Sequence, residues 1–266
     1  MLAIRCLKPA AGGNADRFCA KAGSFADIDH LLGRDHLAGY DGFAMDLGVS
    51  SPHFDRPERG FSFREPGPLD MRFDRTSGQP LSRLLEDLDE ERLRRILKEY
   101  GEERYARRIA RAILRARDGE RLTDTVALAI TIREAYPAYA RYDSPIDPAT
   151  RSFQALRIFV NDELREIRTA LMKTLNAMRP GARLAVISFH SLEDRMVKRL
   201  FRAVSEGERD FFGHRMPAGA RDLTRKPITP APVEAAINPR ARSAKMRVIE
   251  KLDAGQIVKD GDGAIQ

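Results

Sequence analysis

The stretch DLGVSSPHFDRPERGFSFREPGPLDMRFD, residues 46–74, decides how this chain is organised. It follows neither a helical nor a strand period, and its glycines and prolines break regular backbone. The preceding residues GFAM, at 42–45, form a short apolar run that is typical of a buried strand in a parallel sheet. Ligands of open α/β sheets bind beyond the carboxyl ends of the strands. Asp46 is therefore predicted to lie at a binding edge.

Composition restricts the class of protein. The 266 residues are 42% apolar and 32% charged, which is typical of a globular protein and not of a disordered one. The net charge of +7 favours a polyanionic partner such as nucleic acid, although solubility alone is the other explanation. Cys6 and Cys19 lack partners at metal-binding spacing, so we expect no metal site and a reducing compartment, the cytoplasm. No apolar run approaches the ~20 residues that span a bilayer, so no membrane association is expected.

Helical patterns dominate the middle of the chain. Gly101 and Asp118-Gly119 separate three predicted helices, and a longer regular apolar stripe predicts a fourth. The predicted helices are residues 81–100, 102–117, 123–136 and 152–178.

The α/β pattern returns after the fourth helix. Residues 183–188 predict a buried strand, 192–204 a helix, 207–239 a surface loop and 244–252 a final strand of the kind found at sheet edges. The simplest architecture is an N-terminally incomplete, Rossmann-like α/β sheet domain with a helical insertion. The expected boundaries are 1–67 and 148–252 for the sheet domain, 68–147 for the insertion and 253–266 for a flexible tail.

Three blocks carry a resemblance to a known family. Residues 46–74, ISFHSLEDR at 187–195 and NPRARS at 238–243 resemble, in this order, the ribosomal RNA small-subunit methyltransferase H family. The resemblance covers almost the whole chain. It implies a class I methyltransferase that uses S-adenosyl-L-methionine to methylate N4 of a cytidine in the decoding region of 16S rRNA. The implied partner is this rRNA or the assembled small subunit, and the insertion is implied to grip RNA.

The same resemblance raises a question about the cofactor. Family members begin with a strand and a glycine-rich loop, whereas residues 1–4 of this chain resemble the second strand of the family. Arg5 stands where an acid for the ribose hydroxyls is expected. Losing a few charge-assisted hydrogen bonds, at roughly 1.5–3 kcal/mol each, weakens binding by orders of magnitude. We therefore expect this chain to bind adenosylmethionine weakly, and a non-catalytic RNA-binding remnant is the alternative.

The resemblance also implies site residues. It places Asp46 beside the cofactor or the target amine, Phe25 near the adenine and His53 against the cofactor. From the residues alone, Asp46 as a loop cap, Phe25 as a core residue and His53 as a solvated side chain are the alternatives. An acceptor for the protons of the weakly nucleophilic cytosine amine would help the transfer, and Asp46 is the predicted catalytic residue.

His190 follows a predicted strand and is expected at the mouth of the active site, facing RNA. Ser188-Phe189-His190-Ser191 also suggests Ser–His hydrolysis, but no Gly-x-Ser-x-Gly elbow is present and neighbours on a strand point to opposite faces. The other predicted RNA contacts are arginines, for which salt bridges or plain solvation are the alternatives. They are Arg59, Arg64, Arg72, Arg104, Arg108, Arg240 and Arg242.

Overall fold

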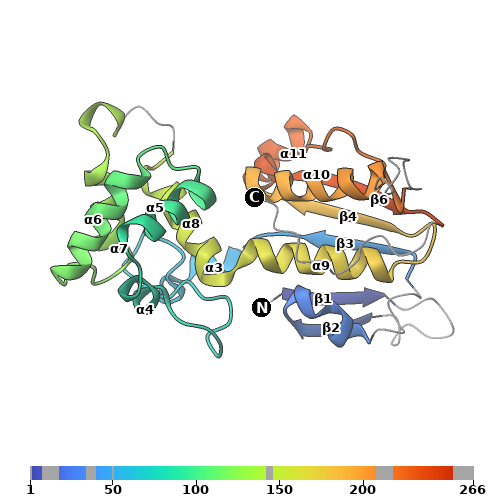
Figure 1. Cartoon of the computed structure of the whole chain (residues 1–266), viewed down its shortest axis with the longest axis horizontal. Helices are drawn as coiled ribbons and strands as arrows, with labels where there is room; N and C mark the ends of the chain where they lie inside the picture. Colours follow the sequence, from blue (N-terminus) through green and yellow to red (C-terminus); the bar gives the residue numbers. More distant parts are fainter. Residues whose placement is uncertain are drawn as a thin grey trace, which may run out of the picture. The chain divides into compact units, whose positions relative to one another are not determined.

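Figure 1 shows the computed structural model of the chain, which describes residues 2–7, 18–33, 40–49, 51–141, 146–207 and 218–253. The fold is mixed α/β, as predicted, and divides into two compact units. The sheet unit comprises residues 1–48 and 164–266, and the helical unit comprises residues 49–163. The expected insertion, 68–147, lies inside the helical unit. That unit is larger than the expected insertion because the loop after residue 48 and the helix before residue 164 both pack into its core.

The sheet unit is built on four strands. They are β3 (Gly42–Asp46), β4 (Arg183–Ser188), β5 (Ala220–Asp222) and β6 (Lys245–Lys251), in the order β3-β4-β6-β5. β3 and β4 are parallel, with Asp46 opposite Ile187, whereas β6 runs antiparallel to both of its neighbours. The carboxyl ends of β3 and β4 consequently meet at one edge of the sheet, which is where α/β proteins bind ligands.

Two expectations about these strands are wrong. Residues 42–45 were expected to be buried, but only Met45 is, because β3 is the outer strand of the four-stranded sheet and has one described neighbour. Residues 244–252 were expected to form an edge strand, but β6 lies between β4 and β5. The segment 207–239 is not only loop, because its described part contains β5 and the short helix α11 (Pro232–Ile237). β5 has just three residues, which leaves too little alternation to detect.

Helices supply most of the apolar packing around the sheet. α9 (Glu163–Ala177) and α10 (Ser191–Glu206) contribute Leu171, Leu175, Val197 and Phe201 to a core that includes Leu184 of β4. Figure 1 shows α10 lying alongside β4 and β6. Two shorter elements, η2 (Phe25–Asp27) and α1 (Ile28–Leu32), pack onto the same core.

The start of the described chain forms a hairpin. The strand expected near residues 1–4 is β1 (Leu2–Leu7), and it pairs antiparallel with β2 (Phe18–Gly23), which no pattern in the sequence predicted. The tail expected at 253–266 lies, apart from Asp253, outside the described residues. None of the described helices combines the length and the apolar character that crossing a bilayer requires.

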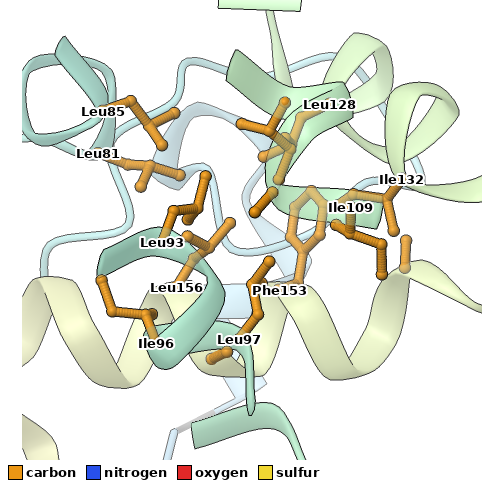
Figure 2. Close-up of a cluster of buried hydrophobic side chains, with 14 of the residues drawn as sticks. Leu81, Leu85, Leu93, Ile96, Leu97, Ile109, Leu128, Ile132, Phe153 and Leu156 are labelled. Carbon is orange, nitrogen blue, oxygen red and sulfur yellow. The ribbon is translucent and has the colours of Figure 1, made fainter. Parts of the chain in front are cut away.

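The helical unit encloses its own core. Its main helices are α4 (Leu81–Glu86), α5 (Glu90–Gly101), α6 (Ala106–Asp118), α7 (Thr125–Ala135) and α8 (Ala149–Asn161). Figure 2 shows their apolar side chains converging, with Leu93, Ile109, Leu128 and Leu156 fully buried. α5 and α8 approach closely because Gly101 has no side chain, and a Cβ there would lie 2.7 Å from the carbonyl oxygen of Arg151.

The helix predicted at 81–100 is two helices. α4 ends at Glu86, and α5 starts after Asp89, whose carboxylate accepts a hydrogen bond from the N–H of Arg92 at 2.7 Å. This contact is an N-cap, which satisfies an otherwise unpaired donor at the start of a helix. The apolar stripe continues across the break because Leu85, Leu88 and Leu93 all enter the same core, so periodicity alone did not reveal it.

The helix predicted at 152–178 is also two helices. α8 ends at Asn161, Asp162 adopts a left-handed conformation with φ +47°, and α9 begins at Glu163. Asn161 terminates α8 because its side chain bonds to the backbone of residues 46–74, which we call the signature loop. Its Nδ2 donates to the carbonyl of Met71, and its Oδ1 accepts from the N–H of Phe73, each at 2.7 Å. Tertiary hydrogen bonds therefore override a continuous helical pattern.

Candidate active site

The carboxyl ends of β3 and β4 form the candidate active site. Strand pairing extends one residue beyond Asp46, where the N–H of Leu47 donates to the carbonyl of Ile187 at 2.9 Å. The next residue, Gly48, has φ +95°, and a Cβ placed there would lie 3.5 Å from the ring of Phe189. The loop that leaves β3 thus contacts the turn that leaves β4. This arrangement brings the first two blocks of the sequence together.

Glu193 anchors this turn from inside. Its side chain is fully buried, and its Oε2 accepts hydrogen bonds from the N–H groups of Phe189, at 2.8 Å, and His190, at 3.3 Å. His190 is the N-cap of α10, and its Nδ1 accepts from the N–H of Glu193 at 3.4 Å. These reciprocal bonds form a capping box. A polar cap followed by Glu three residues later is the sequence signal of such a box, a signal that the prediction of this region did not use.

The electrostatics of the site centre on Asp46. This exposed side chain nevertheless has a raised pKa, because partial desolvation and, secondly, the negative charge of Glu193 disfavour its ionised form. A carboxylate with a raised pKa is a stronger base and is better suited to accept a proton from a reacting amine.

His190 presents a defined tautomer at the same edge. Because its Nδ1 accepts a hydrogen bond, the neutral imidazole carries its proton on Nε2, which lies 3.0 Å from Oε1 of Glu193. The ring is mostly buried, with 14% of its side chain exposed. His190 is thus located at the edge where the sequence predicted it. Its predicted contact with RNA stays a prediction.

The two other predicted cofactor residues lie in different units. Phe25 is partly buried in η2 and packs against the core of the sheet unit, in the unit that carries Asp46. His53 lies in α3 (Ser51–Asp55) of the helical unit, where its ring meets Phe61 and Phe73 edge-on, with centroids 5.2 and 5.5 Å away. His53 is therefore packed against two aromatic rings, and the alternative of a solvated loop histidine does not hold.

Two arginines of the signature loop are engaged within the loop. Nη2 of Arg59 donates to the carbonyls of Arg72 and Phe73 at 2.8 and 2.9 Å. Arg72 forms a forked ion pair with Asp70, with oxygen–nitrogen distances of 2.7 and 3.2 Å. The salt-bridge alternative therefore holds for Arg72. Arg64 is exposed and has no ion pair within the described part of the chain.

The remaining predicted RNA contacts are exposed. Arg104 precedes α6, and Arg108 lies on it; neither forms an ion pair with any residue that the structure describes. By contrast, Arg111, one turn further along α6, pairs with Glu90 at 2.8 Å. Arg240 and Arg242 lie exposed in η5 (Pro239–Ser243) of the sheet unit. The structure thus divides the predicted arginines into Arg59 and Arg72, which stabilise the loop, and the others, whose side chains are exposed.

The mixed α/β fold, with acidic and imidazole side chains at the carboxyl ends of its parallel strands, fits the class of Rossmann-like methyltransferases. Residues 5–252 match the MraW methylase family, and the chain belongs to this family. It is 48% identical over 234 residues to a protein of Geobacter sp. strain M21 named ribosomal RNA small subunit methyltransferase H, covering 86% of this chain and 75% of the relative.

Other relatives carry the same name. The protein of Nitrosococcus oceani is 47% identical over 243 residues, with 88% of this chain and 76% of the relative covered. The protein of Paramagnetospirillum magneticum is 46% identical over 250 residues, with 91% and 77% covered. The chain thus spans about three quarters of the length of these relatives.

Proposed function

We propose that this protein transfers a methyl group from S-adenosyl-L-methionine to N4 of a cytidine in the decoding region of small-subunit rRNA. Membership of the MraW methylase family and the names of the relatives support the reaction class and the rRNA substrate. The observation that carries the proposal is the position of Asp46, at the carboxyl edge of parallel strands beside the turn that Glu193 anchors. The proposed rRNA substrate favours the cytoplasm as the compartment in which the protein acts.

Two side chains of the sheet unit suit parts of this cofactor. Adenosylmethionine supplies a methyl group on a positively charged sulfur and also carries an amine, ribose hydroxyls and an adenine ring. The carboxylate of Asp46 can accept hydrogen bonds from an amine or from hydroxyls, and the half-buried ring of Phe25 can pack against an adenine. The family resemblance adds His53, whose ring is fixed by Phe61 and Phe73.

The chemical role of Asp46 follows from the nucleophile. The lone pair of the cytosine amine is delocalised into the ring, so N4 gains positive charge and must lose a proton as its bond to the methyl carbon forms. Asp46 is the proposed acceptor of that proton, and its raised pKa matches it to the task. General-base catalysis of this kind typically contributes about 10²- to 10⁴-fold to a rate.

Two measurements on the full chain test the proposal. Calorimetry reports adenosylmethionine binding, and mass spectrometry of nucleosides reports N4-methylcytidine after incubation with unmethylated small subunits or free rRNA. The substitution Asp46→Asn should abolish most turnover. Asp41→Asn, at the exposed residue just before the start of the same strand, is the control and should not reduce turnover, although it removes the ion pair with Arg179.

The outcomes separate the two functions that the sequence leaves open. Methylation at N4 that depends on Asp46 supports the proposal, and the choice between subunit and free rRNA follows from the same assay. A folded chain that binds rRNA but neither binds adenosylmethionine nor transfers a methyl group overturns the proposal and supports the RNA-binding alternative.

A further inference from the structure

A pocket of about 200 Å³ opens on the helical unit. It is formed where the chain enters α6, where α7 ends, at η4 (Ala138–Ala140) and at the start of α8. An engineered cavity of about 150 Å³ is enough to bind benzene, so this pocket has room for a flat ring. The mechanism above does not use this pocket, and of its lining residues only Arg104 is among the predicted RNA contacts. Its principal lining residues are Glu103, Arg104, Tyr105, Tyr136, Tyr139 and Arg151.

Three tyrosines give the pocket an aromatic character. Tyr105 meets Tyr136 edge-on, with ring centroids 5.0 Å apart, and its hydroxyl lies 3.5 Å from that of Tyr139. Tyr136 is buried, whereas 74% of Tyr139 is exposed. Tyr139 is exposed and Tyr105 is partly buried, so ring surface is available to a planar partner. Such a partner can form the offset-stacked or edge-to-face contacts that aromatic rings prefer.

The acidic groups of the pocket are already engaged. The hydroxyl of Tyr136 donates to Oε2 of the buried Glu103 at 2.6 Å, and Oε1 of Glu103 accepts from the N–H of Tyr105 at 3.0 Å. Burial and the bond to Glu103 raise the pKa of Tyr136, so its hydroxyl stays protonated and keeps donating. Asp147 is likewise bound by Arg133, at 2.7 Å. These bonds fix the tyrosine rings in place.

The cationic groups of the pocket are in contrast available. Arg104 and Arg151 are exposed, and neither forms an ion pair with a residue that the structure describes. The guanidinium of Arg104 lies over the ring of Tyr105, with Cζ 5.7 Å from the centroid. Proteins recognise unpaired bases by stacking them on aromatic rings and guanidinium planes while basic side chains contact the phosphates.

We infer that this pocket of the helical unit binds an unpaired base of the RNA substrate. The base stacks on Tyr139 and Tyr105, and Arg104 and Arg151 contact the flanking phosphates. The inference rests on the proposed function, which supplies the RNA. A net charge of +7 favours this polyanionic occupant over a neutral or basic protein segment.

Fluorescence anisotropy with a labelled single-stranded rRNA oligonucleotide tests the inference. Tyr139→Ala should weaken binding by the loss of one stacked base, about 5- to 140-fold, which corresponds to about 1–3 kcal/mol. Tyr139→Phe keeps the ring and should bind like the wild type. Ile130→Ala, at an exposed apolar position on α7, is the control for a general surface effect and should not change the affinity.

Salt dependence distinguishes stacking from phosphate contact. Tyr139→Ala should leave the slope of log affinity against log salt unchanged, whereas Arg104→Ala should make it shallower by about 0.7 for single strands. Binding of duplex RNA should not respond to Tyr139→Ala, because paired bases cannot enter the pocket. Equal affinity of the wild type and Tyr139→Ala for single-stranded RNA overturns the inference. The same result is expected if a protein segment, and not RNA, occupies the pocket. Methyl transfer by the wild type is read separately, so this result leaves the proposed function standing.

Discussion

Glu193, in the first turn of α10, and Asp46, at the end of β3, are carboxylates that differ in burial and in hydrogen bonding. Glu193 is fully buried and accepts two backbone hydrogen bonds, whereas Asp46 is exposed and has its pKa raised by partial desolvation and by the charge of Glu193. One acid therefore stabilises the turn, and the other is left more basic than an ordinary aspartate. Environments that separate two carboxylates in this way commonly divide them between structural and chemical roles.

Removing the charge of Glu193 should shift the pH dependence of methyl transfer. Asp46 must be ionised to accept a proton, so activity falls as the pH drops through its raised pKa. The substitution Glu193→Gln removes one cause of the raised pKa of Asp46. The acidic limb of kcat/KM against pH should therefore move to lower pH. Glu206→Gln, an exposed position at the other end of α10, should leave the limb in place.

The raised pKa of Asp46 also predicts an effect on stability, which distinguishes a role of this residue in the reaction from a role in folding. A carboxylate whose pKa is raised by folding opposes folding when it is ionised. At pH 7, Asp46→Asn should therefore abolish most activity without lowering the free energy of unfolding measured in urea. A large loss of stability in this variant would contradict the assignment of Asp46 to the reaction.

The ion pair between Asp194 and Arg247 should stabilise the sheet unit in a pH-dependent manner. It joins α10 to β6 at 2.7 Å, and 13% and 5% of the two side chains are exposed. Although burial opposes ionisation, hydrogen bonds from Arg247 lower the pKa of Asp194 below 3.8. The pair therefore contributes fully above the unfolded pKa of about 3.9 and is lost as pH falls through the lowered folded value.

The measurement for this pair is urea unfolding at several pH values. Asp194→Asn leaves Arg247 buried without its charge partner, so it should lower the free energy of unfolding by about 3–5 kcal/mol at pH 7. The difference from the wild type should shrink below about pH 4. The exposed pair Arg202–Glu206 provides the control, and Glu206→Gln should change stability by less than about 1 kcal/mol.

Two glycines with positive φ in the helical unit, Gly60 and Gly78, should differ in their tolerance of a side chain. Gly60 and Gly78 both have positive φ, +74° and +67°, so alanine at either position incurs about 1–2 kcal/mol of backbone strain. A Cβ at Gly60 would also lie 2.2 Å from the carbonyl oxygen of Pro68, whereas Gly78 faces open space. Gly60→Ala should therefore destabilise the helical unit by about 3–4 kcal/mol in urea unfolding, and Gly78→Ala clearly less. Equal losses would show that the contact with Pro68 is relieved without strain.

Arginines that the sequence cannot distinguish should have different effects on RNA binding. Arg108 is exposed on α6, so Arg108→Gln should weaken binding uniformly across sequences and make the salt slope shallower by about 0.7–0.9. Arg59 donates to two carbonyls of the loop, so Arg59→Gln should lower the stability and leave the salt slope unchanged. Anisotropy titrations at several salt concentrations check both variants, and an unchanged slope in Arg108→Gln would remove this arginine from the RNA surface.

Sequence patterns predicted the strands and helices whose bounds are set by neighbouring residues. The strand at 183–188 and the helix that follows it were predicted almost to the residue, because an apolar run between a glycine turn and a polar cap is unambiguous. The breaks at Asp89 and Asp162 were missed. In both places the apolar stripe continues while a side-chain cap or a tertiary hydrogen bond ends the helix.

The candidate active site, like the fold, was predictable from the sequence only in part. Asp46 and His190 were each placed at strand ends, and their shared edge follows only from the parallel pairing of β3 with β4. The role of Glu193 was missed although the polar cap three residues before it is a local signal, and the structure shows its carboxylate accepting backbone hydrogen bonds. The engagement of Arg59 and Arg72 inside the loop depends on contacts with carbonyls and with Asp70, which spacing along the chain does not encode.

The strand order sets the sequence of events during synthesis. β6 is the last described strand in the chain, yet it lies between β4 and β5. The helical unit, residues 49–163, can close its core while the ribosome is still translating the second half of the sheet unit. Until β6 emerges, the inner edge of β4 has no partner and β5 has no strand to join, so this edge is the part of the nascent chain most exposed to mispairing. Substitutions in β6 should consequently reduce the yield of folded protein out of proportion to their effect on the finished structure.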